Sequence, residues 1–129
     1  MINKRFDVIV VGAALNGLAA ALAFGGVGVR RSLTVAIIDR HDPRQKLARY
    51  DDARASAITA SSKRMFEALG IWDHISRHAQ DMREIIVTDG VDHANRPTLL
   101  QFGEEQSSAN MVENRYLVEG LLLGVEQSP

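Results

Sequence analysis

The sequence contains no cysteine, and this absence excludes several kinds of chemistry. Disulfides, thiolate zinc sites and cysteine nucleophiles all need a thiol, so none of them operates within these 129 residues. A reducing compartment is compatible with a chain that uses no disulfides. We therefore expect a cytoplasmic location.

The sequence also lacks an excess of charge of either sign. Its 15 Lys and Arg residues stand against 16 Asp and Glu residues, which gives a net charge of -1 and a pI of about 6.4. A protein with so little net charge is not attracted electrostatically to the phosphate backbone of a nucleic acid, so we expect no nucleic-acid partner. The apolar share of 46% and the charged share of 24% are typical of one globular domain with a buried core.

No charged side chain occurs between Val8 and Val29, and such a stretch could be a signal peptide or a membrane-spanning helix. Asp7 interrupts the boundary between the basic start and the apolar run, and five glycines within the run would weaken one continuous helix. A strand, a glycine turn and a buried helix explain the same residues better. We therefore expect no integral membrane segment.

The first 39 residues predict a βαβ unit. Phe6 to Val11 is a continuous β-branched and aromatic run, typical of a buried strand, and a second such run covers 33–38. Between them a helix opens at Asn16 or Gly17, carries small and apolar residues, and ends at a group of glycines. The spacing is that of a Rossmann-like dinucleotide-binding unit in an α/β fold.

The turn after the first strand is nearly the Gly-x-Gly-x-x-Gly loop that holds a dinucleotide pyrophosphate. Gly12 and Gly17 fill its first and third positions, but Ala14 stands at the middle one, where the phosphate approaches most closely. Asp39 lies at the end of the second strand and suits an unphosphorylated ribose, hence FAD or NAD rather than NADP. The candidate cofactor-binding residues of this unit are Gly12, Ala14, Leu15, Asn16, Gly17, Asp39 and Arg40. The alternative is an ordinary βαβ unit that binds nothing.

The rest of the chain predicts helices and a small strand portion. We divide the chain into a βαβ unit (1–58) whose residues 41–56 form a loop with a short helical turn, a helical segment (59–82), strands of the substrate-side sheet (83–113) and a helix (114–129). We expect one helix that is capped by Ser61 or Ser62 and ends at Gly70, and a second short helix that is capped by Asp73 and runs through His78. Strands are expected at 83–89 and 98–102, with a loop at 104–110. Asn114 is expected to cap the last helix. An alternating fold should continue with another strand, so the chain is expected to be incomplete relative to the full fold.

Other reactive residue types give no convincing site. His74 and His78 are four apart near Asp81 and would share a helix face, but no third strong ligand is evident, so we expect a solvated face and no metal. The paired serines lack the sharp turn and the base that a nucleophile needs. No catalytic residue can be assigned.

Six segments occur in the same order as in a known family: DVIVVGAALNGLAAALA, VAIIDR, DARASAI, LGIWDHI, IIVTDG and VENRYL. Together they resemble the start of the FAD-dependent hydroxylases of ubiquinone biosynthesis, including 2-octaprenyl-6-methoxyphenol hydroxylase, within the p-hydroxybenzoate hydroxylase superfamily. The resemblance covers nearly all of this chain but roughly the first third of the family's length. It implies an FAD cofactor, NAD(P)H as reductant, O₂, and hydroxylation of an aromatic polyprenyl phenol by the parent protein.

The resemblance also implies residue roles. It makes Gly12 and Gly17 the pyrophosphate turn and Asp39 the ribose acceptor, and it places Arg54 on the FAD and Arg115 near its flavin side. Each arginine could instead be a surface or ion-paired residue.

The chain departs from the family pattern at Ala14, and it lacks the family's later Gly-Asp flavin segment. We expect these 129 residues alone to be inactive and mostly not to retain FAD. Three alternatives stay open: a non-catalytic nucleotide-binding module, a homo-oligomer formed through exposed sheet edges, and an NAD-binding domain of another oxidoreductase. Peripheral association of the parent with the inner membrane is the alternative to a purely cytoplasmic location.

Overall fold

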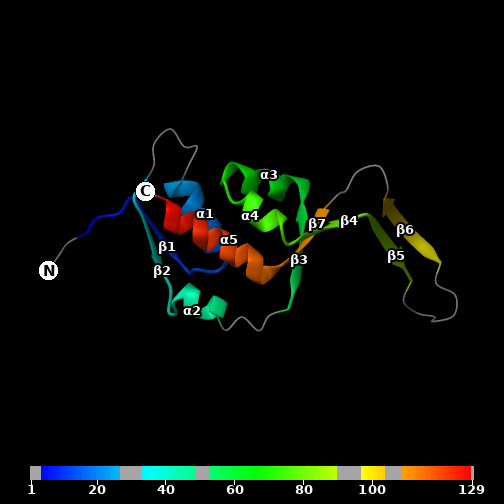
Figure 1. Ribbon diagram of the computed structural model, residues 1–129, viewed down its shortest axis with the longest axis horizontal. Helices are drawn as coiled ribbons and strands as arrows, with labels where there is room; N and C mark the ends of the chain where they lie inside the picture. Colours follow the sequence, from blue (N-terminus) through cyan, green and yellow to red (C-terminus); the bar gives the residue numbers. More distant parts are fainter. Residues whose placement is uncertain (1–3, 27–32, 49–52, 90–96, 104–108, 129) are drawn as a thin grey trace.

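Two helices packed side by side form the centre of the molecule. They are α1 (Leu15–Gly25) and α5 (Asn114–Gln127), and they come from opposite ends of the chain (Figure 1). The computed structural model describes residues 4–26, 33–48, 53–89, 97–103 and 109–128. Within these ranges there are three small sheets and five helices, so the mixed α/β class predicted from the sequence is confirmed.

The predicted βαβ unit is present. Strands β1 (Val8–Val11) and β2 (Val35–Ile38) pair in parallel, with Val8 opposite Val35 and Val11 opposite Ile38. Helix α1 connects them, and it begins at Leu15, just before the predicted start at Asn16 or Gly17. Parallel strands joined by a crossover helix form the unit on which dinucleotide sites are built. In the described part of the chain no helix is long and apolar enough to cross a membrane.

Close packing of α1 on α5 depends on Gly124. A methyl group at this position would lie 2.8 Å from Ile71 Cγ2 and 2.9 Å from Leu22 Cδ1. Apolar side chains from both helices, the central sheet and the segment before α5 form one core, in which Leu18, Ile75, Val112 and Leu121 are the most deeply buried. This core fixes the start of α5 relative to the start of α1, and both starts line the site described below.

A central antiparallel sheet was not predicted. It consists of β3 (Ala55–Thr59), β7 (Ala109–Glu113) and β4 (Ala79–Met82), in the order β3-β7-β4. We expected a loop at 41–56, a loop at 104–110 and a helical segment through residue 82, and those expectations were wrong where these strands lie. The strands are short and contain small or polar residues, so they lack a strong local pattern. They are stabilised by pairing between residues far apart in the sequence, such as Ala55 with Glu113 and Met82 with Ala109.

Three shorter helices surround the core. The short helical turn expected after β2 is α2 (Pro43–Ala48), and the two helices expected after it are α3 (Ala60–Ala68) and α4 (Trp72–Ser76). Their exact caps differ from the prediction. Thr59, not Ser61 or Ser62, caps α3, and its hydroxyl accepts a hydrogen bond from the Ser62 N–H at 3.4 Å.

The caps of the other two helices were also predicted wrongly. Ile71 is the N-cap of α4, with Asp73 inside the first turn, and the helix stops before His78. Glu113 is the N-cap of α5, so Asn114 is the first helical residue. In both cases the chain enters the helix one or two residues earlier than the polar residue that the sequence rules favour as a cap. Gly70 follows α3 with a φ of +74°, as expected for a glycine that ends a helix.

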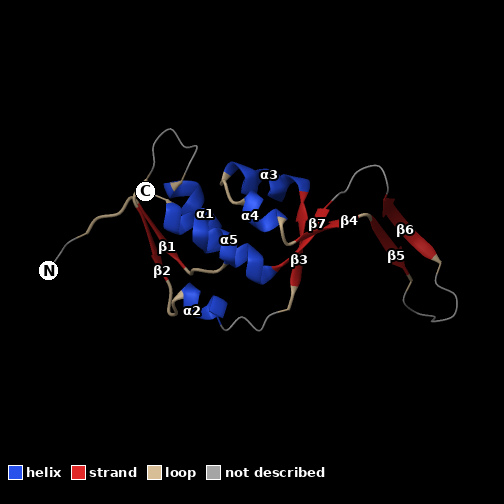
Figure 2. Ribbon diagram, viewed as in Figure 1, coloured by secondary structure: helices blue, strands red, loops and turns tan. Residues whose placement is uncertain are grey.

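A β-hairpin extends from the far side of the central sheet. Strands β5 (Glu84–Thr88) and β6 (Thr98–Gly103) are the two that the sequence predicted, and they pair antiparallel. Figure 2 shows the hairpin at the end of the molecule opposite β1 and β2. Leu99, Leu100 and Phe102 are each more than half exposed. The described residues therefore leave an apolar surface on this hairpin uncovered.

Candidate functional site

The turn between β1 and α1 has the geometry that its glycines predict. Gly12 has a φ of +104°, a conformation that side-chain-bearing residues rarely adopt, and its N–H donates to the Ile38 carbonyl at 2.7 Å. At Gly17, an added Cβ would lie 1.8 Å from the Gly12 carbonyl oxygen. Gly12 therefore makes the turn, and Gly17 lets the helix lie directly against it.

The first turn of α1 keeps its amide groups available. Its N-cap is Ala14, which has no side chain able to accept their hydrogen bonds, and no acidic residue occurs in the first turn. The free N–H groups and the positive end of the helix dipole favour an anion here. Ala14 has a φ of -90° and a ψ of -176°, which any residue adopts, so the backbone does not require glycine at this position.

A cavity of about 320 Å³ opens beside this helix start. Its walls come from the turn, the start of α2, the segment before β3 and the first turns of α5. The lining residues are Ala13, Ala14, Leu15, Asn16, Pro43, Arg54, Asn114 and Val118. Three predicted site residues from the loop are thus brought together with Arg54, which is about 40 positions away in the sequence. A guanidinium beside a helix N-terminus makes the cavity suitable for a phosphate group.

Asp39 is tied to the same turn. One of its carboxylate oxygens accepts the Ala13 N–H at 2.7 Å, and the other accepts the His41 N–H at 2.9 Å. The carboxylate is thereby held in one orientation directly after β2. It lines a second cavity of about 350 Å³, which shares Ala13 and Pro43 with the first. A ligand with a ribose at Asp39 and phosphates at α1 would pass along the Ala13 backbone between the two cavities.

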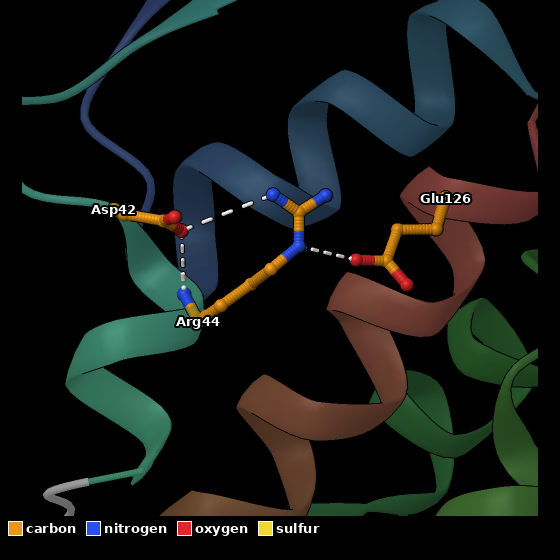
Figure 3. A network of polar contacts seen from close by, with 3 residues as sticks. All are labelled: Asp42, Arg44 and Glu126. Carbon is orange, nitrogen blue, oxygen red and sulfur yellow. Dashed lines mark hydrogen bonds and ion pairs between the residues drawn. The ribbon is translucent and has the colours of Figure 1, made fainter.

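The second cavity is bordered by an ion pair that joins α2 to α5. Arg44 Nε lies 2.6 Å from Glu126 Oε1, and Figure 3 shows Arg44 on α2 reaching across to Glu126 on α5. Asp42 accepts the Arg44 N–H at 2.9 Å and lies 4.0 Å from its guanidinium. The hydrogen bond to Glu126, then the charges of Glu126 and Asp42, raise the pKa of Arg44 above its ordinary value. The guanidinium therefore stays charged at every pH at which the protein is folded.

We predict that the Arg44–Glu126 pair fastens α2 to α5 in a salt-dependent way. Arg44→Glu should lower the melting temperature slightly because it sets two carboxylates against each other, and the double variant R44E/E126R should recover most of the loss. The effect should be small, since both side chains are well exposed, and it should shrink in 1 M salt. Thermal unfolding at low and high salt measures it. Equal melting temperatures for Arg44→Glu and the unchanged chain at low salt would contradict the prediction.

The predicted site arginines Arg40 and Arg115 line neither cavity. Arg115 Nε lies 2.9 Å from Glu113 Oε2, and its guanidinium lies over the Tyr116 ring at 4.6 Å. Arg40 is exposed and lines neither cavity. Their assignment to the cofactor site stays a prediction from family resemblance. Conversely, Asn114 and Pro43 line the cavity although the sequence did not single them out for binding. Asn114 lies directly beside Arg115 in the VENRYL segment, which was the available signal.

The sequence predicted that His74 and His78 share a helix face, and this prediction was wrong. His78 lies beyond the end of α4 and stacks on Tyr116, with ring centroids 3.6 Å apart, while His74 Nε2 lies 3.7 Å from Glu119 Oε2. Among the described residues no group of three His, Cys, Asp or Glu side chains is placed to hold a metal ion.

Comparison with known proteins agrees with the geometry of the turn and its acid. The FAD binding domain family matches residues 5–119. The chain belongs to this family. The FAD-binding domain is 34% identical to the ubiquinone hydroxylase UbiL of Rhodospirillum rubrum, over 98% of this chain and 28% of UbiL. It is 28% identical to the mitochondrial ubiquinone biosynthesis monooxygenase COQ6 of Schizosaccharomyces pombe, over 74% of this chain and 21% of COQ6. The chain thus spans less than a third of the length of either relative.

Solved structures show the same fold. A variant of PqsL from P. aeruginosa superposes on 97% of this chain and 32% of its own, with a TM-score of 0.72 and 18% identity. The flavin-dependent monooxygenase PieE, solved with FAD and substrate, superposes on 98% of this chain and 23% of its own, with a TM-score of 0.64 and 20% identity. The fold is therefore that of part of a flavin-dependent monooxygenase.

FAD is the cofactor of this domain, and the residues present fit it. The positive φ of Gly12 makes the tight turn, and the missing Cβ at Gly17 lets α1 begin directly against it, as a pyrophosphate turn needs. The uncapped start of α1 and the neighbouring Arg54 supply N–H donors and positive charge. The one poor match is the methyl group of Ala14, which lines the cavity at the helix N-cap.

We predict that Ala14→Gly strengthens FAD binding several-fold, because it removes a methyl from the position of closest phosphate approach. Glycine is also a better N-cap than alanine, so the substitution should not weaken the helix. The dissociation constant for FAD and the melting temperature of the apoprotein measure the two effects. An unchanged or weaker affinity would show that the methyl does not obstruct the cofactor.

Proposed function

We propose that this chain is the N-terminal FAD-binding part of a flavin-dependent monooxygenase that hydroxylates the phenolic ring of a ubiquinone precursor. The main support is the 34% identity to a ubiquinone hydroxylase over almost the whole chain, combined with an intact glycine turn beside Asp39 and Arg54. When bound, FAD would supply the redox chemistry, with NAD(P)H as reductant and O₂ as the source of the hydroxyl oxygen. The substrate would be an aromatic polyprenyl phenol.

In this proposal the residues described above bind and orient the cofactor. The start of α1 and Arg54 hold the pyrophosphate, Gly12 and Gly17 form the turn that places the start of α1, and Asp39 accepts hydrogen bonds from the adenosine ribose. Arg40 lies beside that acid, and Arg115 acts near the flavin end. No described residue is assigned a chemical step.

The β5–β6 hairpin would belong to the substrate-side sheet. Pairing places Ile85 opposite Phe102 and Val87 opposite Leu100, so these four side chains share one face, while Glu84 and Gln101 lie on the other. An apolar face of this kind suits contact with further protein or with a polyprenyl substrate. The complete protein would be cytoplasmic and peripheral to the inner membrane.

The test is expression of the complete reading frame that encodes this chain. The protein should be yellow, or become yellow with added FAD, and it should oxidise NAD(P)H when given a polyprenyl phenol and O₂. The matched control is Gly17→Ala, which should remain colourless. A colourless full-length protein that FAD cannot reconstitute would contradict the proposal.

Self-association is a second candidate property of the 129-residue chain. The exposed apolar residues of the β5–β6 hairpin and its unpaired strand edges favour pairing with a second copy. Light scattering of this chain over a range of concentrations tests it, and a monomer at every concentration would contradict it.

An NAD-binding domain of different chemistry is distinguished by calorimetric titration with FAD and with NAD. Tighter binding of NAD would favour that alternative.

A further inference from the structure

One wall of the 350 Å³ cavity, formed by residues 39–44, is anchored at both of its ends. At one end, the Asp39 carboxylate accepts the Ala13 N–H at 2.7 Å and joins the wall to the glycine turn. At the other end, Arg44 Nε lies 2.6 Å from Glu126 Oε1 and joins the wall to α5. Asp39 therefore belongs to a segment whose second anchor is an ion pair with a different helix.

Local hydrogen bonds stiffen the segment between its two anchors. The His41 N–H donates to the Asp39 carboxylate at 2.9 Å. The Asp42 carboxylate accepts the Arg44 N–H at 2.9 Å, and the Asp42 carbonyl accepts the Gln45 N–H at 3.1 Å. Because each of these bonds joins residues two or three positions apart, a displacement of Arg44 is passed along the segment towards Asp39.

The ion pair is able to open while the core stays packed. The Arg44 side chain is 65% exposed and that of Glu126 is 41% exposed, so water and salt reach both charges. Leu47, one turn further along α2, packs against the core, whereas Pro43 at the start of α2 lines both cavities. Opening of the pair would therefore free the cavity end of α2 without unfolding the protein.

We propose that the Arg44–Glu126 pair is a clamp that sets how long FAD stays bound, because it holds the 39–44 segment against the adenosine half of the cofactor. Arg44 and Glu126 are positioning residues, and they act through Asp39. This inference rests on the proposed FAD site, in which the adenosine ribose lies at Asp39. The geometry favours positioning over direct contact, since the Arg44 guanidinium is already engaged by Glu126 and lies 4.0 Å from Asp42.

The test is a charge swap in the full-length protein, with FAD release followed by flavin fluorescence after dilution of the complex. Arg44→Glu should speed release ~3- to 10-fold, because it removes an ion pair and sets two carboxylates against each other. The double variant R44E/E126R remakes the pair in the reverse direction and should return the rate to within ~2-fold of the unchanged protein. Arg44→Glu should weaken ADP binding by a similar factor and leave riboflavin binding unchanged, whereas a general loosening of the fold would weaken both.

A milder variant and a control complete the experiment. Glu126→Gln keeps the size of the side chain, removes the ion pair without repulsion, and should speed release ~2- to 5-fold. The control is Glu119→Arg, a charge reversal on the same helix beside His74 and outside both cavities, which should leave FAD release unchanged.

Three results would decide against an assignment. Unchanged release from Arg44→Glu, or from Glu126→Gln if the first variant does not fold, would overturn the clamp. Equally fast release from Arg44→Glu and R44E/E126R would also overturn it, because moving the charge to α5 does not rescue an arginine that contacts FAD itself. Failure of the unchanged protein to bind FAD would instead overturn the proposed function.

Discussion

Gly17→Ala is expected to abolish FAD binding and to destabilise the fold by about 3 kcal/mol. Its Cβ would lie 1.8 Å from the Gly12 carbonyl oxygen, which is a backbone atom and cannot move aside like the end of a flexible side chain. Either α1 moves away from β1, or the turn at Gly12 changes its conformation. Both outcomes displace the helix N-terminus from the cavity. Chemical denaturation and FAD titration of the same preparation measure the two losses.

The control for Gly17 is the same substitution at Gly103. A Cβ at that position would lie 3.4 Å from the nearest atoms, which is ordinary van der Waals contact, and Gly103 lies on the exposed hairpin far from the turn in sequence. Gly103→Ala should therefore change neither stability nor FAD affinity measurably. An FAD affinity for Gly17→Ala equal to that of Gly103→Ala would show that the turn does not carry the cofactor.

Arg54→Met is expected to weaken FAD binding ~10- to 100-fold, which is the range for losing a hydrogen bond to a charged group. Arg54 lines the cavity beside Ala14 and Asn16, where a guanidinium would pair with the pyrophosphate. Methionine retains much of the apolar stem, so packing around the cavity should survive. Increased salt should weaken FAD binding less in the variant than in the unchanged protein, since one charged contact is missing.

Arg115→Met is the informative comparison. Family resemblance places Arg115 near the flavin, whereas here its guanidinium is engaged by Glu113 and Tyr116 and lies outside the cavity lining. The geometry predicts a smaller loss of affinity than for Arg54→Met. A loss as large as that of Arg54→Met would show that Arg115 leaves Glu113 when FAD binds. Isothermal titration with FAD distinguishes the two results.

The features that could be predicted from the sequence are those with a local cause. Continuous apolar runs predicted β1 and β2, and the spacing of Gly12, Gly17 and Asp39 predicted the turn and its acid. Each of these features is set by residues that are close together in the sequence or, for Asp39, by a position at the end of a strand. The hairpin strands β5 and β6 were predictable for the same reason, because their β-branched and apolar residues stand out locally.

The features that could not be predicted depend on distant pairing. Strand β3 has only Ile58 fully buried, and its small and polar residues resemble a loop until β7 supplies its partner. Asn114 resembled a helix cap, because asparagine before an apolar helical stripe usually is one. Its contact with Ser56 and its place beside the glycine turn arise only when β3 and β7 pair. Three of the eight residues that line the cavity, Pro43, Asn114 and Val118, were therefore not identified from the sequence.

Competition between FAD and each of its two halves shows which half the glycine turn binds. In the proposed site the ADP half of FAD lies on the turn formed by Gly12 to Gly17, with its ribose at Asp39. In the protein from the complete reading frame, ADP should therefore compete with FAD for binding, and riboflavin should compete much more weakly. Gly17→Ala should lose the competition by ADP. Displacement of FAD by riboflavin but not by ADP would contradict the account, because it would place the main cofactor contacts away from the glycine turn.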